Sequence, residues 1–553
     1  MKLRAWFAAI SFAALGCGTA SQMSQETIFT GTVVAGAAQT ARAGHGVYVA
    51  DGLIREIGPA GSLAASHPRA RVIATGGTIL PGLTDAHAHL YGLGLALDTV
   101  NLTESTSVEE VMARVRDRAG ATPAGEWILG RGWDQNDWPV KDFPKAADVD
   151  AVVSDRPVWL KRIDGHAGLA NTAAMRAAGI TAATPEPPGG RVLRDASGAP
   201  TGVFIDDAMD LVERVVPAVS FEQRKRRVLA SAERIATNGL TEIHDAGADA
   251  ETIRAVRELI DEGRFPIRVY AMLGDSAPLL REWFGRGPLM NYGGRLTVRS
   301  VKLYADGALG SRGAALLEPY SDDPGNKGLM LASIEHIVDV ARRARQAGFQ
   351  VNTHAIGDAG VRNVLDGYAA AGVEANDRFR IEHLQVVAPD DFDRLVNLGV
   401  IASMQPTHGT SDMYWAEHRL GPTRVRGAYA WRSVLESGGR LALGSDFPVE
   451  EVSPWLGIHA AVTRQDRKNW PEGGWYPDQR LTLAEAIRGF TIDAAYAAFE
   501  EESRGTIEPG KLADLTIVKD DVFATPPAAL DDVTVLYTVV GGQIVYTAPA
   551  AGR

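Results

Sequence analysis

Two histidines follow an apolar, turn-rich run in the first fifth of the chain. His87 and His89 lie in the segment Thr84–Leu90, directly after the run Thr78–Leu83. Because residues two apart in a β-strand point to the same side, the two imidazoles can reach one point. This spacing is typical of metal ligands, although two histidines in a chain of 553 residues also pair by accident.

Four further side chains capable of metal chemistry stand within or just after other apolar runs. They are Lys302 in Val298–Tyr304, His354 after Val351-Asn352-Thr353, His383 after Arg380-Ile381-Glu382, and Asp446 after Leu441–Leu443. Each has an ordinary structural alternative when taken alone: an ion pair with Asp306 for Lys302, hydrogen-bonded core positions for the histidines, and a capping role for Asp446. Their shared position at strand ends favours a common site.

The runs alternate with amphipathic helical patterns, which is typical of parallel βα units. Helical patterns cover residues 221–237, 250–261 and 333–347. The candidate strands are Ile79–Leu83, Leu240–Ile243, Ile267–Met272, Val298–Tyr304, Gln350–Thr353, Phe379–Ile381, Val400–Met404 and Leu441–Leu443. Eight such strands predict an α/β fold, a (β/α)₈ TIM-like barrel whose site lies at the carboxyl ends of the strands.

Short β runs with glycine turns occupy both ends of the chain, and Asp51-Gly52 is a hairpin signal. We therefore expect residues 21–79 and 500–553 to form one small composite β-sandwich, with the barrel spanning 80–499. The stretch from about 101 to 218 is too long for one crossover and predicts an inserted subdomain over the barrel mouth. Its strand-like segment Pro157–Lys161 leaves the barrel strand count open.

The first twenty residues have the pattern of an export signal. Lys2 and Arg4 precede the apolar run Ala5–Leu15, and small residues follow. Ala14-Leu15-Gly16-Cys17 resembles a bacterial lipobox, which predicts a lipoprotein modified at Cys17; ordinary cleavage after Ala20 is the alternative. We expect a periplasmic or membrane-anchored protein. Cys17 is the single cysteine, so no intrachain disulfide is expected.

The charge distribution restricts the class of partner. The net charge is -12 and no long Lys/Arg tract occurs, which argues against nucleic acid, since phosphate binding needs clustered cations. A small-molecule substrate is expected, with membrane contact only through the N-terminal lipid anchor. The sequence does not indicate an oligomeric state.

Several motifs together resemble the metal-dependent amidohydrolase superfamily, and specifically its amidohydrolase-3 branch, which includes N-substituted formamide deformylases. The resemblance runs from about residue 27 to the end. The motifs are Pro81–His89, Val301–Arg312, Thr353–Asp358, Ile381–His383, Ser403–Pro406, Gly444–Pro448 and Glu508–Leu515.

The resemblance implies a site with two divalent metal ions. His87, His89 and Asp446 would hold one ion and His354 and His383 the other, bridged by Lys302 carboxylated with CO₂ to a carbamate. An ammonium cannot ligate a cation, but burial beside two dications lowers the pKa of a lysine. Imidazole and carboxylate ligands favour Zn²⁺, and they also accept Fe, Mn or Co.

Other residues are candidates for substrate contact. His166, in Asp164–Asn171, is predicted to bind the substrate carbonyl oxygen or an anion, which would place it beside Asp446 in catalysis. Trp133, with Asp134 and Trp138, is a candidate aromatic wall, and His408 and Asp412 are candidate substrate contacts. His244 is expected to support the metal ligands. Loop and core positions are the alternatives for these residues.

The resemblance implies hydrolysis of a non-peptide C–N bond, in an N-acyl or N-formyl amide, by a hydroxide that bridges the metals. Asp446 would accept its proton and deliver it to the departing nitrogen. The same site could cleave esters, lactones or carbamates, whereas deamination is disfavoured by Lys302. From another class, a surface-anchored binding protein without catalysis is the alternative.

Overall fold

The computed structural model describes residues 26–549 apart from 37–38, 136–137, 163–166, 188–189 and 311, and apart from the side chain of Asp206. The export signal, Cys17 and His166 lie outside the described residues, so what the sequence suggests for them stays a prediction. Within the described part of the chain, no helix combines the length and apolarity needed to cross a membrane.

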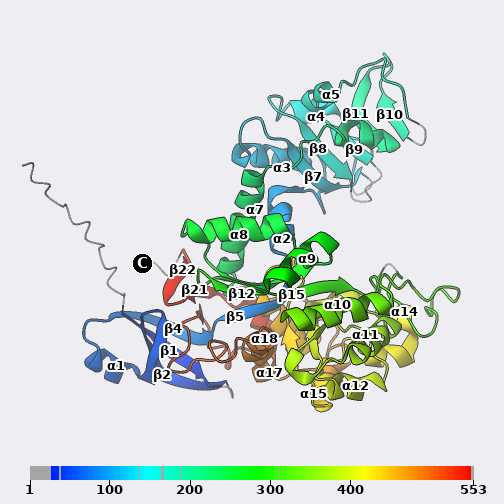
Figure 1. Ribbon diagram of the computed structural model, residues 1–553. Helices are drawn as coiled ribbons and strands as arrows, with labels where there is room; N and C mark the ends of the chain where they lie inside the picture. Colours follow the sequence, from blue (N-terminus) through cyan, green and yellow to red (C-terminus); the bar gives the residue numbers. More distant parts are fainter. Residues whose placement is uncertain are drawn as a thin grey trace, which may run out of the picture.

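Eight parallel strands form the centre of the protein, in the order β19-β18-β17-β16-β15-β13-β12-β5 (Figure 1). The short strand β14 (Leu289–Tyr292) pairs antiparallel with β15 outside this order. The eight strands are β5 (Leu83–Ala88), β12 (Leu240–Ala248), β13 (Arg268–Gly274), β15 (Leu296–Tyr304), β16 (Gln350–Ala355), β17 (Arg380–His383), β18 (Ile401–Met404) and β19 (Leu441–Leu443).

The first and last strands approach each other just beyond β19. The Asp446 amide donates to the His87 carbonyl at 2.8 Å, and the His89 amide donates to the Phe447 carbonyl at 3.0 Å. Gly444 permits this approach, because a Cβ there would lie 2.6 Å from the His87 nitrogen. The strands therefore form a nearly closed barrel, which confirms the predicted α/β barrel.

The prediction that the first barrel strand covers Ile79–Leu83 is wrong. Residues up to Pro81 belong to β4 (Arg71–Pro81) of another sheet, and the barrel strand starts at Leu83. Between them, the Gly82 amide donates to the Asp514 carbonyl at 2.8 Å. A Cβ at Gly82 would lie 2.3 Å from the Thr241 hydroxyl, so the chain crosses between the two sheets at a glycine. Consequently His87 lies inside its strand.

Helices surround the barrel, and several of them begin at side-chain caps and bury one face. Ser220, Asp249 and Ser333 each accept a hydrogen bond from the third residue of the helix that follows. Buried residues then recur three or four apart, as an amphipathic helix requires. These helices are α7 (Phe221–Thr237), α8 (Ala250–Asp261), α9 (Ala277–Arg286), α10 (Ile334–Ala347), α11 (Asp358–Ala371), α12 (Asp391–Asn397), α13 (Pro406–Asp412), α14 (Ala416–Arg424), α15 (Trp431–Glu436), α16 (Pro454–Thr463), α17 (Leu483–Gly489) and α18 (Ile492–Ala497).

Both chain ends contribute to a second sheet, of seven strands, in the order β22-β21-β20-β4-β1-β2-β3. β20 pairs antiparallel with β4, so the C-terminal strands continue the N-terminal ones, and the two groups share one apolar core. Its elements are β1 (Thr27–Ala35), β2 (Thr40–Ala50), β3 (Leu53–Pro59), α1 (Ala60–Ser66), β4, β20 (Leu515–Val518), β21 (Val535–Val540) and β22 (Gln543–Thr547).

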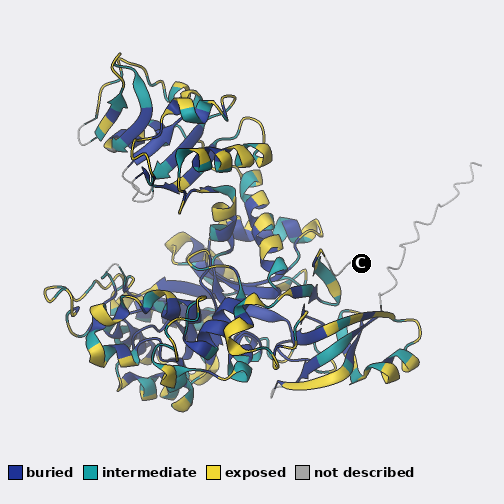
Figure 2. Ribbon diagram, turned by 180° about the vertical axis from the view of Figure 1, so that it is seen from behind, coloured by how far each residue is buried: buried dark blue, intermediate teal, exposed yellow. Residues whose placement is uncertain are grey.

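A third sheet, in the order β10-β11-β9-β8-β7-β6, has its own buried core and stands away from the barrel (Figures 1 and 2). It is joined to the barrel through α2 (Leu90–Asp98) and α7. We expected the insertion to lie over the barrel mouth, but its sheet does not cross the carboxyl ends of the barrel strands. The segment Pro157–Lys161 lies largely in this sheet and adds no barrel strand. The elements are β6 (Val100–Asn101), α3 (Val108–Ala121), β7 (Ile128–Trp133), α4 (Ala146–Asp150), β8 (Val158–Arg162), β9 (Ala167–Ala170), α5 (Thr172–Ala177), β10 (Gly190–Arg194), β11 (Pro200–Asp206) and α6 (Asp210–Glu213).

The packing of α2 against α7 explains this placement. The Arg227 Nε donates to the Asp98 carboxylate at 2.7 Å, and Arg118 pairs with the same carboxylate at 3.0 Å. A Cβ at Gly94 would lie 2.3 Å from the Arg227 carbonyl oxygen, so the two helices meet backbone to backbone. This close, charge-paired contact directs the insertion outward from the barrel.

A buried ion pair connects the barrel to the seven-stranded sheet. Arg268 of β13 donates two hydrogen bonds to the Asp514 carboxylate, at 2.8 and 2.9 Å. Burial alone would raise the pKa of Asp514, but the Arg268 guanidinium more than offsets this and holds the pKa below its ordinary value. The contribution of Asp514 to stability is therefore present at neutral pH and is lost as the pH falls through this depressed pKa.

We expect Asp514→Asn to lower the free energy of unfolding by about 3–5 kcal/mol, because the buried Arg268 charge loses its partner. Urea denaturation at pH 7 measures this change. Asp339→Asn is the matched control, since its carboxylate pairs with Arg343 on an exposed helix surface, and it should cost less than about 1 kcal/mol. Equal losses in the two variants would contradict the structural role of Asp514.

Candidate metal centre

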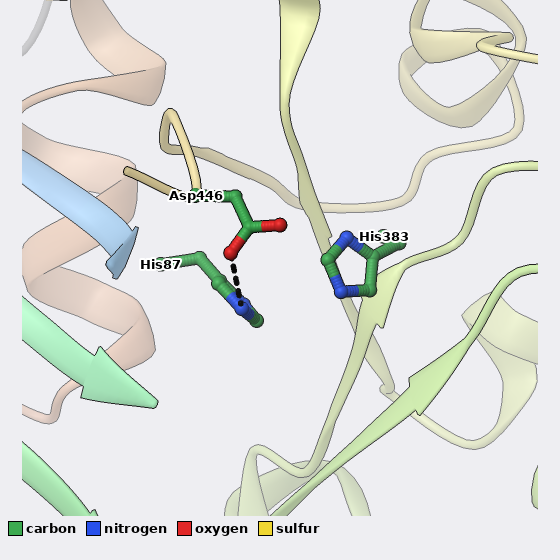
Figure 3. A group of neighbouring side chains, drawn as sticks. All are labelled: His87, His383 and Asp446. Carbon is green, nitrogen blue, oxygen red and sulfur yellow. Dashed lines mark ion pairs between the residues drawn. The ribbon is translucent and has the colours of Figure 1, made fainter. Parts of the chain in front are cut away.

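Three potential metal ligands from distant parts of the sequence meet at the carboxyl ends of the barrel strands. His87 comes from β5, His383 ends β17, and Asp446 follows β19 (Figure 3). One ligand atom of each lies within 4.8 Å of those of the other two, and all three residues are buried. His87 Nε2 and the Asp446 Oδ1 are 3.5 Å apart.

The remaining predicted ligands surround these three. His89 Nε2 lies 3.0 Å from Asp446 Oδ1. The Lys302 Nζ lies 3.3 Å from His87 Nε2, and the ring centroids of His354 and His383 are 4.6 Å apart. The structure therefore brings all six side chains to one place.

Lys302 does not form an ion pair with Asp306, although the structure describes both residues. The Asp306 carboxylate instead accepts hydrogen bonds from the amides of Ala315, Ile356 and Gly357 at 2.8–2.9 Å, and so ties two loops together. Lys302 is 1% exposed and its Nζ lies 4.8 Å from the centroid of the Tyr304 ring. The ammonium group is thus directed to the ligand cluster.

Hydrogen bonds at the Nδ1 atoms orient two of the histidines. His87 Nδ1 donates to the buried Glu382 carboxylate at 2.5 Å, and His383 Nδ1 donates to Gln405 Oε1 at 2.8 Å. A histidine that donates through one ring nitrogen keeps a lone pair on the other. Both Nε2 atoms are therefore left as electron-pair donors.

Asp85 organises the loop that carries Asp446. Its carboxylate accepts hydrogen bonds from the amides of His87 and Ser445, both at 3.1 Å, and from the Ser445 hydroxyl at 2.6 Å. Burial raises the pKa of Asp85 to about 7, partly offset by these hydrogen bonds. Asp85 thus holds the end of β5 against the Asp446 loop.

Burial also sets the charge state of the ligands. It lowers the pKa values of His87 and His383 well below their ordinary value, lowers that of His354 to about 4, and lowers that of Lys302. Burial alone would raise the pKa of Asp446, but the imidazoles of His89 and His87 hold it well below its usual range. The site thus combines the imidazoles of His87, His354 and His383, which burial keeps neutral, with one carboxylate.

These groups fit a divalent metal ion. The Asp446 Oδ1 is buried and accepts no hydrogen bond from the described part of the chain, despite its closeness to His89. A buried carboxylate oxygen without a donor is costly unless a cation satisfies it. Neutral imidazoles and a carboxylate are the ligands that Zn²⁺ and similar ions prefer.

Two of the ligands have unusual backbone conformations. His383 has a φ of +71° and Asp446 a φ of +63°, both in the left-handed region that non-glycine residues rarely adopt. Such a conformation costs on the order of 1–3 kcal/mol and persists where the surrounding structure enforces it. Here it turns two strand-end side chains toward the centre of the barrel mouth.

The other candidate residues are divided between the site and positions away from it. His408 lies at the site, with its ring stacked on that of His383 and its Nε2 3.7 Å from Asp446 Oδ2. The Asp412 carboxylate accepts hydrogen bonds from Tyr429 at 2.7 Å and Gln385 at 3.1 Å, and so supports the packing beside α13. It has no contact with the predicted ligands among those that the structure records.

The tryptophan prediction is not supported by the structure. Trp133 is fully buried in the core of the insertion and donates through Nε1 to the Leu160 carbonyl, and Trp138 donates to the Ser105 carbonyl. Asp134 pairs with Arg162 at 2.6 Å. The two tryptophans therefore pack within the insertion, where their ring centroids are 6.4 Å apart.

His244 lies inside the barrel below the ligands, where its Nδ1 accepts a hydrogen bond from Arg380 at 2.9 Å. Arg380 in turn approaches the Ala86 carbonyl at 3.4 Å, next to His87 in the chain. His244 therefore supports the ligand strand indirectly. His166 lies outside the described residues.

Sequence reasoning missed Glu382, Gln405 and Asp85 as functional residues. All three lie within motifs already singled out, one or two residues from a predicted ligand or strand end. A polar residue buried directly beside a metal ligand is the signal that could have identified them, because ligating histidines need a hydrogen-bond acceptor at their second nitrogen.

A nearly closed parallel barrel with histidines and an aspartate gathered at the carboxyl ends of its strands is the architecture of a metal-dependent barrel hydrolase. The chain belongs to the amidohydrolase family, whose model matches residues 72–546. Membership of this family implies the use of divalent metal ions.

Individual relatives agree with this assignment. The chain is 34% identical to YtcJ of Bacillus subtilis (strain 168) over 510 residues, 90% of this chain and 95% of the relative. It is 27% identical to an N-substituted formamide deformylase of Arthrobacter pascens over 504 residues, 87% of this chain and 91% of the relative. A crystal structure of an uncharacterized metal-dependent hydrolase from Pyrococcus furiosus is similar with a TM-score of 0.73 and 28% identity, over 90% of this chain and 99% of that chain.

We expect Glu382→Gln to weaken metal binding about 10- to 100-fold, because an amide group no longer fixes the His87 tautomer as a carboxylate does. The change is measured as the metal content that remains after equilibrium dialysis against increasing concentrations of a chelator. Glu251→Gln, on the exposed first turn of α8, serves as control and should bind metal normally. Unchanged affinity in Glu382→Gln would show that His87 is oriented by other contacts.

Proposed function

We propose that the protein hydrolyses a C–N bond of a non-peptide amide, of the N-acyl or N-formyl kind, with two divalent ions, Zn²⁺ in the first instance. The observation that carries the proposal is the convergence of six predicted ligands at the strand ends, with the Asp446 Oδ1 left without a hydrogen-bond donor. The similarity to an N-substituted formamide deformylase supports the choice of an amide bond.

In this proposal His87, His89 and Asp446 would hold one ion, His354 and His383 would hold the other, and Lys302, as a carbamate formed with CO₂, would contribute to holding both. Divalent ions in such a site lower the pKa of a coordinated water toward about 7 and polarise a carbonyl oxygen. The burial of Lys302 and its lowered pKa favour the neutral amine that reacts with CO₂.

The side chains then manage the protons of the reaction. Asp446 accepts a proton from the attacking water at a carboxylate oxygen and returns it to the departing nitrogen. The acyl carbon gains a C–O bond and loses its C–N bond, so a carboxylate and an amine are released. His408, 3.7 Å from the Asp446 Oδ2, is placed to contact the substrate beside this carboxylate.

A hydrolysis screen tests the reaction class. The purified, metal-loaded protein is assayed on N-formyl amides, N-acyl amino acids, dipeptides, esters and lactones, and released amine or acid is quantified. Faster hydrolysis of an amide than of the matched ester supports the proposal. Exclusive cleavage of esters or lactones would show that the protein is an esterase or lactonase instead of an amidase. A metal-loaded chain that cleaves none of these substrates would favour a binding protein.

We expect Asp446→Asn to lower kcat by at least about 10²-fold, the lower range for loss of a positioned acid–base group. Measured metal content should fall much less than the rate does, because four histidines and Lys302 remain. Asp339→Asn is again the control and should retain full activity. An Asp446→Asn variant with normal kcat would exclude the proposed proton transfer.

Lys302 is tested through metal stoichiometry. We expect about two metal equivalents per chain after reconstitution with metal and bicarbonate, a mass increase of one CO₂ on Lys302, and less metal when bicarbonate is left out. Lys302→Ala should retain at most one equivalent under the same conditions. Two equivalents in Lys302→Ala would contradict the bridging role.

A further inference from the structure

Tyr304 is the exposed last residue of β15, directly beside the proposed metal centre. Its side chain is 42% exposed. Its ring centroid lies 5.5 Å from that of His354 and 4.8 Å from the Lys302 Nζ. A large aromatic residue thus covers one side of the ligand cluster while one face stays open to solvent.

A cavity of about 410 Å³ opens on one side of this ring. Its lining consists of Asp275, Tyr304, Leu331, Ala332, Ser333 and His336. Two polar side chains of the cavity contact each other, since His336 Nε2 lies 2.7 Å from the Asp275 carboxylate. The apolar part of the lining comes from Tyr304, Ala332 and Leu331, which is 58% exposed.

A second cavity, of about 260 Å³, lies on the other side and is lined in part by His89, Tyr91, Asp245, Gly247, Asp249 and Pro448. It is smaller, and at its edge Asp245 accepts a hydrogen bond from the Leu90 amide at 2.9 Å. The Tyr304 hydroxyl would lie 3.8 Å from a Cβ built on Gly247. Tyr304 therefore reaches the edge of this second cavity and separates the two.

The position of Asp446 assigns a direction to the substrate. Asp446 is 3.0 Å from His89, and both His89 and Pro448 line the smaller cavity. Because Asp446 returns the proton to the departing nitrogen in the proposed reaction, the nitrogen side of the amide faces this smaller cavity. The acyl side then faces Tyr304.

We propose that the cavity beside Tyr304 is the acyl-group subsite, and that the preferred substrates carry a bulky apolar acyl group, such as an arylacyl group. This inference rests on the proposed amide hydrolysis and narrows its substrate class away from formyl compounds. A cavity of roughly 150 Å³ suffices for benzene, so the space beside Tyr304 accommodates an aryl ring. Offset or edge-to-face contact with the tyrosine ring adds to the apolar burial.

The test uses two matched substrate pairs. One pair keeps the amine constant and varies the acyl group, with N-ethylphenylacetamide against N-ethylacetamide. The other keeps the acyl group constant and varies the amine, with N-phenethylacetamide against N-ethylacetamide. The wild-type protein should prefer phenylacetyl to acetyl by at least about tenfold in kcat/KM.

Tyr304→Ala should reduce the phenylacetyl preference about fivefold to tenfold, mainly through KM, and leave the amine-side preference within twofold. Tyr304→Phe retains the ring and should retain the preference. Leu331 does not contact Lys302, and Leu331→Ala should also reduce the phenylacetyl preference. Met290→Ala is the control, because Met290 is about as exposed as Leu331 but lies on β14 at the opposite end of the barrel.

An unchanged acyl preference in both Tyr304→Ala and Leu331→Ala, or a change in the amine preference instead, would overturn the proposal. Calorimetric binding of phenylacetate and acetate, the acyl products, separates this failure from failure of the proposed function. If no amide is cleaved but phenylacetate binds more tightly than acetate and Tyr304→Ala removes the difference, the subsite stands and the reaction class is wrong. Equal binding of the two acids would reject the subsite.

Discussion

The site depends on the contact that closes the barrel, where the Asp446 amide donates to the His87 carbonyl at 2.8 Å. Asp85 strengthens this contact by hydrogen bonding to Ser445, 360 positions later in the chain. The contact leaves no room for a side chain at Gly444. Without it the barrel would be open between β5 and β19, and a carboxylate would not face the histidines of β5 and β17.

Burial then gives these side chains the chemistry of metal ligands. It keeps the imidazoles of His87 and His383 neutral, while Glu382 and Gln405 accept hydrogen bonds from their Nδ1 atoms and leave the Nε2 atoms free. The Asp446 Oδ1 is left without a hydrogen-bond donor in the described structure. A divalent metal ion would supply the positive charge that this arrangement of donors lacks.

In the proposed arrangement the substrate cavities adjoin the predicted metal site, and His89 lines one of them. The two cavities are built from the end of β12, the loops after β13, β15 and β19, and the start of α2. The insertion stands away from these loops, and its large tryptophans are buried in its own core (Figure 1). In the proposed arrangement the loops beside Tyr304 contact the group next to the reacting carbonyl.

The sequence by itself determined the strand and helix pattern of the barrel, since β-runs and capped amphipathic helices are local signals, and α7 and α8 begin and end where their patterns do. It also predicted the ligand types, because Lys302 stands within a recognisable apolar run, and His87, His354, His383 and Asp446 stand just after such runs. Only the tertiary structure decided that Ile79–Pro81 belongs to another sheet, because the break at Gly82 depends on contacts with Thr241 and Asp514. It likewise decided which histidines Glu382 and Gln405 contact and that Trp133 is buried, because these contacts are made with residues distant in the sequence. The position of Tyr304 beside a cavity depends on the space between loops, which no local sequence pattern encodes.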